Sequence, residues 1–219
     1  MTVTFFVPRD SGALALGAEK VARTLQDEIA ARNLDARIVR NGSRGMYWLE
    51  PMVEVETPSG RVAYGPVKPS DLASLLDTGM AEGRTHPLWL GLTEHLPFLA
   101  KQTRLTFARC GITDPVSLDD YRAHDGLKGL EKALALSPLE IVTQVTESGL
   151  RGRGGAGFPT GIKWKTVLDA AGERKYIVCN ADEGDSGTFA DRMIMEGDPF
   201  VLIEGMTIAG IAVGATKGY

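Results

Sequence analysis

The sequence predicts an α/β protein in two parts, a small N-terminal module and a larger part that carries a glycine-rich loop. Three observations support this prediction. Apolar runs of strand length alternate with helical periodicity at the start of the chain, proline and glycine breaks follow, and six glycines crowd into one sixteen-residue segment further on. A length of 219 residues suits one large domain or two small ones.

Four segments near the start of the chain have the apolar runs or the alternation of β-strands. The first two are short apolar runs, and the last two flank Pro58-Ser59-Gly60, which predicts a hairpin. The predicted strands are residues 3–7, 36–39, 52–56 and 61–64.

Two helices complete this module. Apolar residues at helical spacing predict a helix over residues 17–32, which should stop near Asn33. Pro69-Ser70-Asp71 opens a second, shorter helix with three leucines on one side. The order strand, helix, strand, strand, strand, helix predicts a small thioredoxin-like module over residues 1–80.

Residues 81–127 are predicted to be a linker with one short helix around 93–102, and residues 128–219 form the second part. Ser137-Pro138-Leu139-Glu140 is a capping box with proline at the first helical position. The elements expected here are helices at 126–136, from Ser137 to Gly149, at 162–170 and at 201–216, and a buried strand at 175–179. The last helix is almost wholly apolar, and too few residues follow to cover it, so we expect a fragment of a longer protein.

The segment from Gly149 to Trp164 is the most informative in the chain. Its glycines are Gly149, Gly152, Gly154, Gly155, Gly157 and Gly161, and its cations are Arg151, Arg153 and Lys163. Glycine backbone lets neighbouring N–H groups converge on one anion, and flanking cations attract that anion. The segment therefore predicts a site for a phosphate-bearing cofactor. The alternative is a flexible surface loop, which rarely combines so many glycines with Arg, Phe and Trp.

Familiar phosphate-binding motifs do not fit this segment. Gly152, Gly154 and Gly157 satisfy G-x-G-x-x-G, but a helix rather than a strand precedes them, so an ordinary Rossmann site is not expected. Trp164 stands where a P-loop needs Ser or Thr, and we interpret it as a core residue. The sequence leaves open whether Phe158 stacks on a planar ring or packs in the core.

A second polar segment follows the predicted strand at 175–179. Asn180 can donate and accept, whereas Asp182, Glu183 and Asp185 accept when ionised. These carboxylates could form a cation site or a solvated turn, but beside a cationic glycine loop we favour one mixed-charge cofactor cleft at the carboxyl edge of the sheet.

Several classes of protein are excluded or disfavoured. A net charge of −4 argues against a general nucleic-acid binder. The chain has no apolar run of spanning length and no basic start, so membrane insertion and a signal peptide are not expected, and the cytoplasm is the default location. Cys110 and Cys179 cannot supply a four-thiolate metal site, and the three histidines pair with no nucleophile.

Residues 149–164, together with Tyr176 to Glu183, closely resemble the FMN- and NADH-binding 51 kDa-type (NuoF-like) subunit of respiratory complex I. The family includes the diaphorase subunits of NAD-reducing hydrogenases and of NAD-dependent molybdenum formate dehydrogenases. The resemblance covers about residues 104–219, and Gly184 to Arg192 looks most like the formate dehydrogenase β subunit. It implies the N-terminal part of a complex I-type FMN-binding α/β domain.

The resemblance also implies roles for residues of the loops. Gly152, Gly154 and Gly155 would approach FMN through backbone, with Arg153 among the binding residues and Lys163 near flavin and nicotinamide. The remaining expected contacts are Asn180, Asp182 and Glu183 to the ribityl chain and ring edge, Phe158 to the adenine of NADH, and Asp185 to the nucleotide. Asp185 replaces the usual glutamate, and Thr166 replaces a second aromatic, so the grip on the nucleotide should differ from that in complex I.

The N-terminal module resembles a thioredoxin-like [2Fe–2S] ferredoxin domain without its ligands. Alignment on Gly17-Ala18 and Pro51 places the four ligand positions at Pro8, Ala13, Ser43 and Tyr47, and none is a thiolate. We therefore expect no cluster in residues 1–219 and a docking role for this module. The family's [4Fe–4S] cluster would belong to a missing C-terminal part.

The resemblance thus implies a diaphorase-type NADH:acceptor oxidoreductase subunit that passes hydride between FMN and NAD(H), in a formate dehydrogenase from formate to NAD⁺. The implied partners are a NuoE-like [2Fe–2S] γ subunit and an α subunit that carries molybdenum and iron–sulfur clusters. The 219 residues alone should be inactive. The alternatives are the equivalent subunit of a hydrogenase or of complex I, and a cofactor-free docking or assembly fragment.

Overall fold

A computed structural model describes residues 2–219 of the chain. The chain divides into two compact units. The first is Met1–Asp120 with Phe189–Pro199, and the second is Tyr121–Thr188 with Phe200–Tyr219. Each unit is described by itself. Over residues 2–219, every helix is too short or too polar to cross a bilayer.

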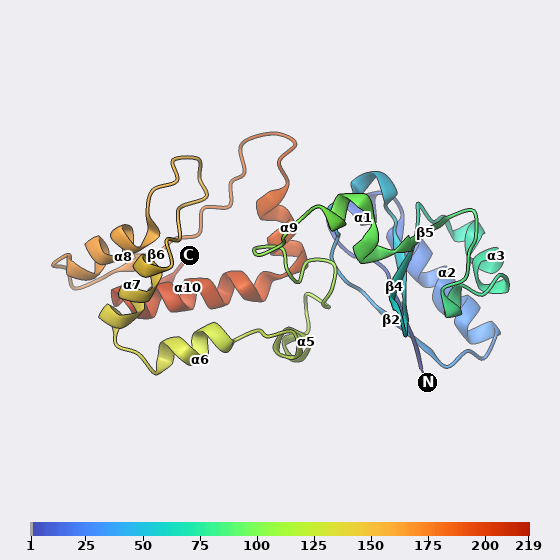
Figure 1. The fold of residues 1–219 in the computed structure, drawn as a ribbon, viewed down its shortest axis with the longest axis horizontal. Helices are drawn as coiled ribbons and strands as arrows, with labels where there is room; N and C mark the ends of the chain where they lie inside the picture. The colour runs from blue at the N-terminus through green and yellow to red at the C-terminus, as the bar shows by residue number, and fades with distance from the viewer. Residues whose placement is uncertain (1) are drawn as a thin grey trace. The chain divides into compact units, whose positions relative to one another are not determined.

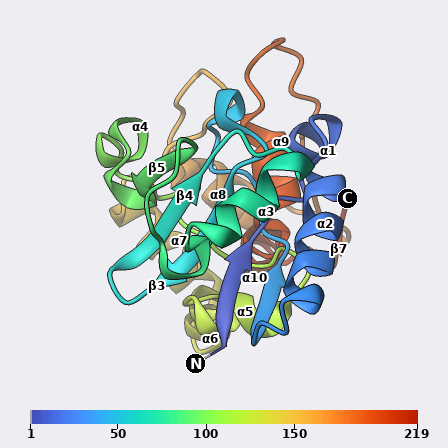
Figure 2. The same ribbon diagram turned by 90° about the vertical axis from the view of Figure 1, so that its right-hand side faces the viewer.

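The first unit is built on a five-stranded sheet of order β2-β1-β3-β4-β5 (Figure 2). Its strands are β1 (Val3–Phe6), β2 (Ala36–Val39), β3 (Val53–Thr57), β4 (Gly60–Tyr64) and β5 (Trp89–Leu92). β1 and β2 run parallel, and the other neighbours are antiparallel, with Val53 of β3 opposite Tyr64 of β4. This arrangement confirms the predicted thioredoxin-like α/β module.

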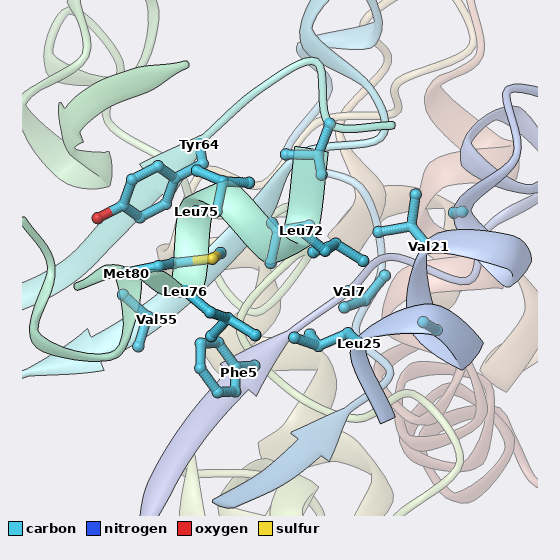
Figure 3. Close-up of a cluster of buried hydrophobic side chains, with 14 of the residues drawn as sticks. Phe5, Val7, Val21, Leu25, Val55, Tyr64, Leu72, Leu75, Leu76 and Met80 are labelled. Carbon is cyan, nitrogen blue, oxygen red and sulfur yellow. The ribbon is translucent and has the colours of Figure 1, made fainter. Parts of the chain in front are cut away.

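Helices cover one face of this sheet and enclose the main core (Figure 3). The helices on this face are α1 (Ser11–Ala15), α2 (Ala18–Ala31) and α3 (Leu72–Asp77). α4 (Pro97–Ala100) packs through Leu99 in a second, smaller cluster, and α5 (Leu118–Ala123) runs across the division between the units. Leu25 of α2 and Leu72 of α3 are fully buried against Phe5 and Val55 of the strands. Burial of each such side chain contributes about 1.5–3 kcal/mol. The buried residues therefore recur at helical spacing in the sequence, and this periodicity predicted α2 and α3.

The other face of the sheet carries a buried ion-pair network. Because strand residues alternate between faces, Glu54 points away from the core that holds Val53 and Val55. Its carboxylate lies 3.1 Å from Nη2 of Arg44 and 3.4 Å from Nη1 of Arg61. Burial lowers the pKa of Arg61, whose guanidinium lies over the Phe6 ring, 3.3 Å from the centroid.

The segment expected to be a linker, residues 81–127, has more structure than predicted. β5 lies inside it and pairs with β4 as the fifth strand, and the division between the units falls after Asp120. The short helix predicted near 93–102 is present as a 3-10 turn and α4. The four 3-10 helices are Tyr47–Leu49, Pro69–Asp71, Met80–Glu82 and Thr93–His95.

The second unit is mostly helical (Figure 1). Its helices are α6 (Lys128–Leu134), α7 (Pro138–Glu147), α8 (Thr160–Asp169) and α10 (Pro199–Val213), and its two strands are β6 (Tyr176–Ile177) and β7 (Lys217–Gly218). The long apolar α10 packs its end against α6 and α7, where Ala133, Ile141 and Val142 meet Ala212 and Val213. Glu204 of α10 accepts hydrogen bonds from the N–H groups of Leu127 and Leu130 at 2.9 Å, and so caps α6.

The prediction of a buried strand over Lys175–Cys179 was wrong. β6 has only two residues, paired in parallel with β7, and Val178 is 70% exposed. Of the apolar residues Tyr176, Ile177 and Val178, Ile177 contacts the core around α10, and the other two are exposed. The polar segment after it therefore follows a two-stranded ribbon and not the edge of a large sheet.

Candidate cofactor-binding site

The glycine loop starts where α7 ends. α7 has the predicted capping box, in which the Ser137 side chain accepts from Glu140 N–H and the Glu140 carboxylate accepts from Ser137 N–H. Gly149 follows the C-cap with φ +69°, a left-handed conformation that terminates the helix. The capped helix before the loop and the stop at Gly149 are both confirmed.

Hydrogen bonds close the base of the loop. Gly152 N–H donates to Phe158 O at 2.8 Å, and Thr160 N–H donates to Leu150 O at 2.9 Å. Nη1 of Arg151 donates to Gly157 O at 3.0 Å. These bonds hold residues 153–157 as a short projecting tip.

The tip presents bare backbone. A Cβ atom added at Gly154, Gly155 or Gly157 would meet no atom within 4 Å, and Gly155 and Gly157 have φ of +97° and +59°. A side chain at either of these two positions would be strained, whereas glycine accepts the conformation freely. The tip can therefore approach a ligand through its main chain.

Lys163 brings a cation to the base of the loop. It lies in the first turn of α8, and a Cβ at Gly152 would lie 3.2 Å from its Nζ. Nζ is also 5.9 Å from the centroid of the Phe158 ring, which is half exposed. Gly152, Phe158 and Lys163 thus come together as one cluster. The neighbouring Trp164 packs against the core around α10, as interpreted from the sequence.

The acidic segment forms a separate exposed loop. Asp182 N–H donates to Oδ1 of Asn180 at 3.1 Å, which makes an Asx turn, and Thr188 N–H donates to Asp185 O at 3.3 Å. Glu183 adopts φ +49°. This loop and the glycine loop extend from the same side of the second unit (Figures 1 and 2).

The two loops supply complementary chemistry. Free main-chain N–H groups and the Lys163 ammonium suit a phosphate, whereas carboxylates and an amide suit hydroxyl groups and ring N–H groups. Among residues 2–219, no group of three or more His, Cys, Asp or Glu side chains is placed to hold a metal ion. The arrangement fits a phosphate-bearing organic cofactor.

Gly161 has a structural role that the sequence did not reveal. It is buried where α8 crosses α7, and a Cβ there would lie 2.6 Å from Cα of Thr146. An apolar cavity of about 500 Å³ lies beside this crossing, lined by Leu139, Val142 and Ile162. A second one of about 470 Å³ lies along α10 and β7. Neither includes the glycine tip, which is an open surface.

In the first unit, the four aligned ligand positions have other surroundings. Pro8 and Ala13 are buried, and Ser43 Oγ donates to Oε1 of Glu50 at 2.9 Å. Burial raises the pKa of Glu50 to about 7. The Tyr47 ring lies edge-on to Phe189, with 5.9 Å between centroids.

Comparison with known proteins adds independent information. Residues 145–219 match the family model of the Nuo51 FMN-binding domain. The chain is 55% identical over 118 residues to the NADP-reducing hydrogenase subunit HndC of Solidesulfovibrio fructosivorans, a match that covers 54% of this chain and 24% of that protein. It is 46% identical over 99 residues to the alpha subunit of the NAD-reducing hydrogenase HoxS of Cupriavidus necator, covering 45% of this chain and 16% of the relative.

A third relative is named for its reaction with quinone. This is the F 2 protein of the NADH-quinone oxidoreductase of Rhizobium meliloti, 55% identical over 109 residues, with 49% of this chain and 26% of the relative covered. Among solved structures, a thioredoxin-like [2Fe-2S] ferredoxin from Aquifex aeolicus is 22% identical, and the match covers 41% of this chain and 97% of that chain with a TM-score of 0.36. The chain spans about a quarter or less of the length of these curated relatives.

Proposed function

We propose that this chain is the FMN-binding part of an NADH-linked oxidoreductase subunit, since residues 145–219 are of the complex I 51 kDa FMN-binding type. The family predicted from the residues is confirmed by this match and by relatives that are 55% identical over about half of the chain. The glycine tip and the acidic loop are the two halves of the proposed site.

The observation that carries the proposal is the projecting backbone of Gly154 and Gly155, in a loop whose base at Gly152 lies beside the Lys163 ammonium. We infer that the amides of Gly154 and Gly155 face the FMN phosphate, while Lys163 and Arg153 balance its charge. Gly152, whose N–H donates to Phe158 O, would let the cofactor approach the backbone at the base of the loop.

The acidic loop would hold the rest of the cofactor. Asn180, Asp182 and Glu183 would accept hydrogen bonds from the ribityl hydroxyls and the ring edge. Phe158, which is half exposed, offers a stacking face for the adenine of NADH, and Asp185 would contact that nucleotide. Bound FMN would supply hydride exchange with the nicotinamide, and these residues would orient the two rings and need not transfer a proton.

Substitution of Lys163 tests the phosphate contact. Lys163→Ala should weaken FMN binding by about 10- to 100-fold, because it removes one charge-assisted contact to phosphate. The matched control is Lys165→Ala, because Lys165 lies on the same helix and pairs with Asp169. Fluorescence titration with FMN measures both affinities. Equal affinities for the two variants would refute the role of Lys163.

The finer proposal concerns the parent enzyme. The segment from Gly184 to Arg192 favours the β subunit of an NAD-dependent molybdenum formate dehydrogenase, whose partners would be a [2Fe–2S] γ subunit and a molybdenum-containing α subunit. The names of the relatives support a hydrogenase or a quinone reductase equally well. Genes next to this one distinguish them, because a molybdenum-cofactor subunit, a nickel–iron subunit and membrane subunits have different sequences.

A further inference from the structure

We propose that the first unit positions the acidic loop. It does so by holding the helix that follows this loop, through contacts to the Glu196 side chain of that helix. The inference rests on the proposed function for the role of the loop, but the contacts that hold the helix lie within the first unit. The helix is α9 (Ala190–Gly197), which begins two residues after Thr188 and belongs to the first unit.

The Glu196 carboxylate makes a two-point contact with the start of α1. Ser11 N–H donates to Oε2 at 2.8 Å, and the Ser11 hydroxyl donates to Oε1 at 2.8 Å. Both donors come from one residue, so the carboxylate is fixed in position and orientation. Asp10, which caps α1, is close enough that Glu196 helps to raise its pKa, after burial as the main cause.

Two glycines of the first unit also contact α9, one at its last residue and one along its side. A Cβ at Gly42 would lie 2.6 Å from Cα of Gly197, so the two chains touch without side chains between them. Met193 packs against Gly45, whose Cβ would lie 3.3 Å from its Sδ. Directly after the helix, Asp198 is buried and accepts from Nε of Arg109 at 2.8 Å.

The start of α9 lies against Tyr47. Phe189 meets the Tyr47 ring edge-on, and the Arg192 guanidinium lies over the Phe189 ring, 4.5 Å from its centroid. Tyr47 occupies the last of the four aligned ligand positions, and Ser11 lies two residues before another, Ala13. The region expected to dock a partner therefore holds a helix of the same chain.

These contacts of α9 anchor the C-terminal end of the acidic loop. The N-terminal end of the loop follows β6. Tyr219 N–H donates to Ile177 O at 2.9 Å, and Cys179 N–H donates to Tyr219 O at 2.8 Å, which hold the first end. A segment with an anchored end samples fewer conformations before it binds a ligand, so it loses less conformational freedom on binding and its affinity is higher. Glu196 is thus a positioning residue for Asn180, Asp182 and Glu183, although it does not touch the cofactor.

Glu196→Ala tests the proposal on the flavin-free chain by hydrogen exchange with mass spectrometry. The expected result is about tenfold faster exchange over residues 181–188 and 190–197, because the two-point contact is lost, with protection of α2 and α10 unchanged. FMN affinity should fall by about tenfold in the same variant. Ser11→Ala, which removes one of the two donors, should give a smaller change in the same direction.

Asp27→Ala is the matched control, since it removes an exposed carboxylate from α2 of the same unit. It should change neither exchange nor affinity. Faster exchange confined to 190–197 in Glu196→Ala, with 181–188 unaltered, would overturn the positioning role. Failure of the unsubstituted chain to bind FMN would refute the proposed function instead, and the exchange result would still decide whether the first unit holds the loop.

Discussion

Gly161→Ala is expected to destabilise the second unit by about 3 kcal/mol, since overpacking at a backbone contact cannot relax by side-chain rotation. The added Cβ would overlap Oγ1 of Thr146 and lie 2.6 Å from its Cα, so α7 and α8 must move apart. Because the chain has two units, one overall unfolding curve is not two-state, and hydrogen exchange over α7 and α8 is the appropriate measurement.

Two further variants sharpen this test. Gly205→Ala is the control, because an added Cβ there meets no atom within 4 Å and alanine favours helix over glycine by about 0.5–1 kcal/mol. Thr146→Ala in the Gly161→Ala background should restore less than half of the loss, because Cα of Thr146 remains in place. Full restoration would show that the hydroxyl alone makes the contact, contrary to this account.

The second large effect is expected at Glu54. Glu54→Gln should destabilise the first unit by about 3 kcal/mol, because it removes the buried carboxylate shared by Arg44 and Arg61 and leaves them only the exposed carboxylates of Glu94 and Glu56. Arg44 is 3% exposed and Glu54 is 1% exposed, so water cannot replace the lost charge. Protection of α2 and β3 from hydrogen exchange reports the change.

Glu56 provides the matched control for Glu54. It lies on the same strand and the same face, its carboxylate is 4.0 Å from Nε of Arg61, and its side chain is 57% exposed. Glu56→Gln should therefore change stability by less than about 0.5 kcal/mol, as is usual for exposed pairs. Similar losses of stability for Glu54→Gln and Glu56→Gln would mean that burial does not determine how much an ion pair contributes to the stability of this unit.

Much of the fold could be predicted because the information for its helices is local. The spacing of Val21, Leu25 and Ile29 located α2, and Ser137 with Glu140 located the start of α7. β5 could not be located in this way. It contains Gly91 at φ +103° and depends on pairing with β4, which lies about 30 residues earlier in the chain.

The site could be predicted only in part for the same reason. Glycine content and charge selected the loop as the candidate site, and the structure adds that the backbone at Gly154 and Gly155 is open. Nothing local distinguished Gly161 from the glycines of the tip, because its role is set by Thr146 on another helix. Glu204 and Glu196 also escaped notice, since each acts on backbone donors more than 70 residues away in the sequence.

Titration of the unsubstituted chain with FMN and with riboflavin shows whether the glycine tip binds the phosphate of FMN. Riboflavin has the same ring and ribityl chain but no phosphate. If the tip binds the phosphate, FMN fluorescence will be quenched on binding and the affinity for riboflavin will be at least about 100-fold lower, because the charge-assisted contacts are lost. Equal affinity for the two flavins, or no binding of FMN, would contradict this role of the tip.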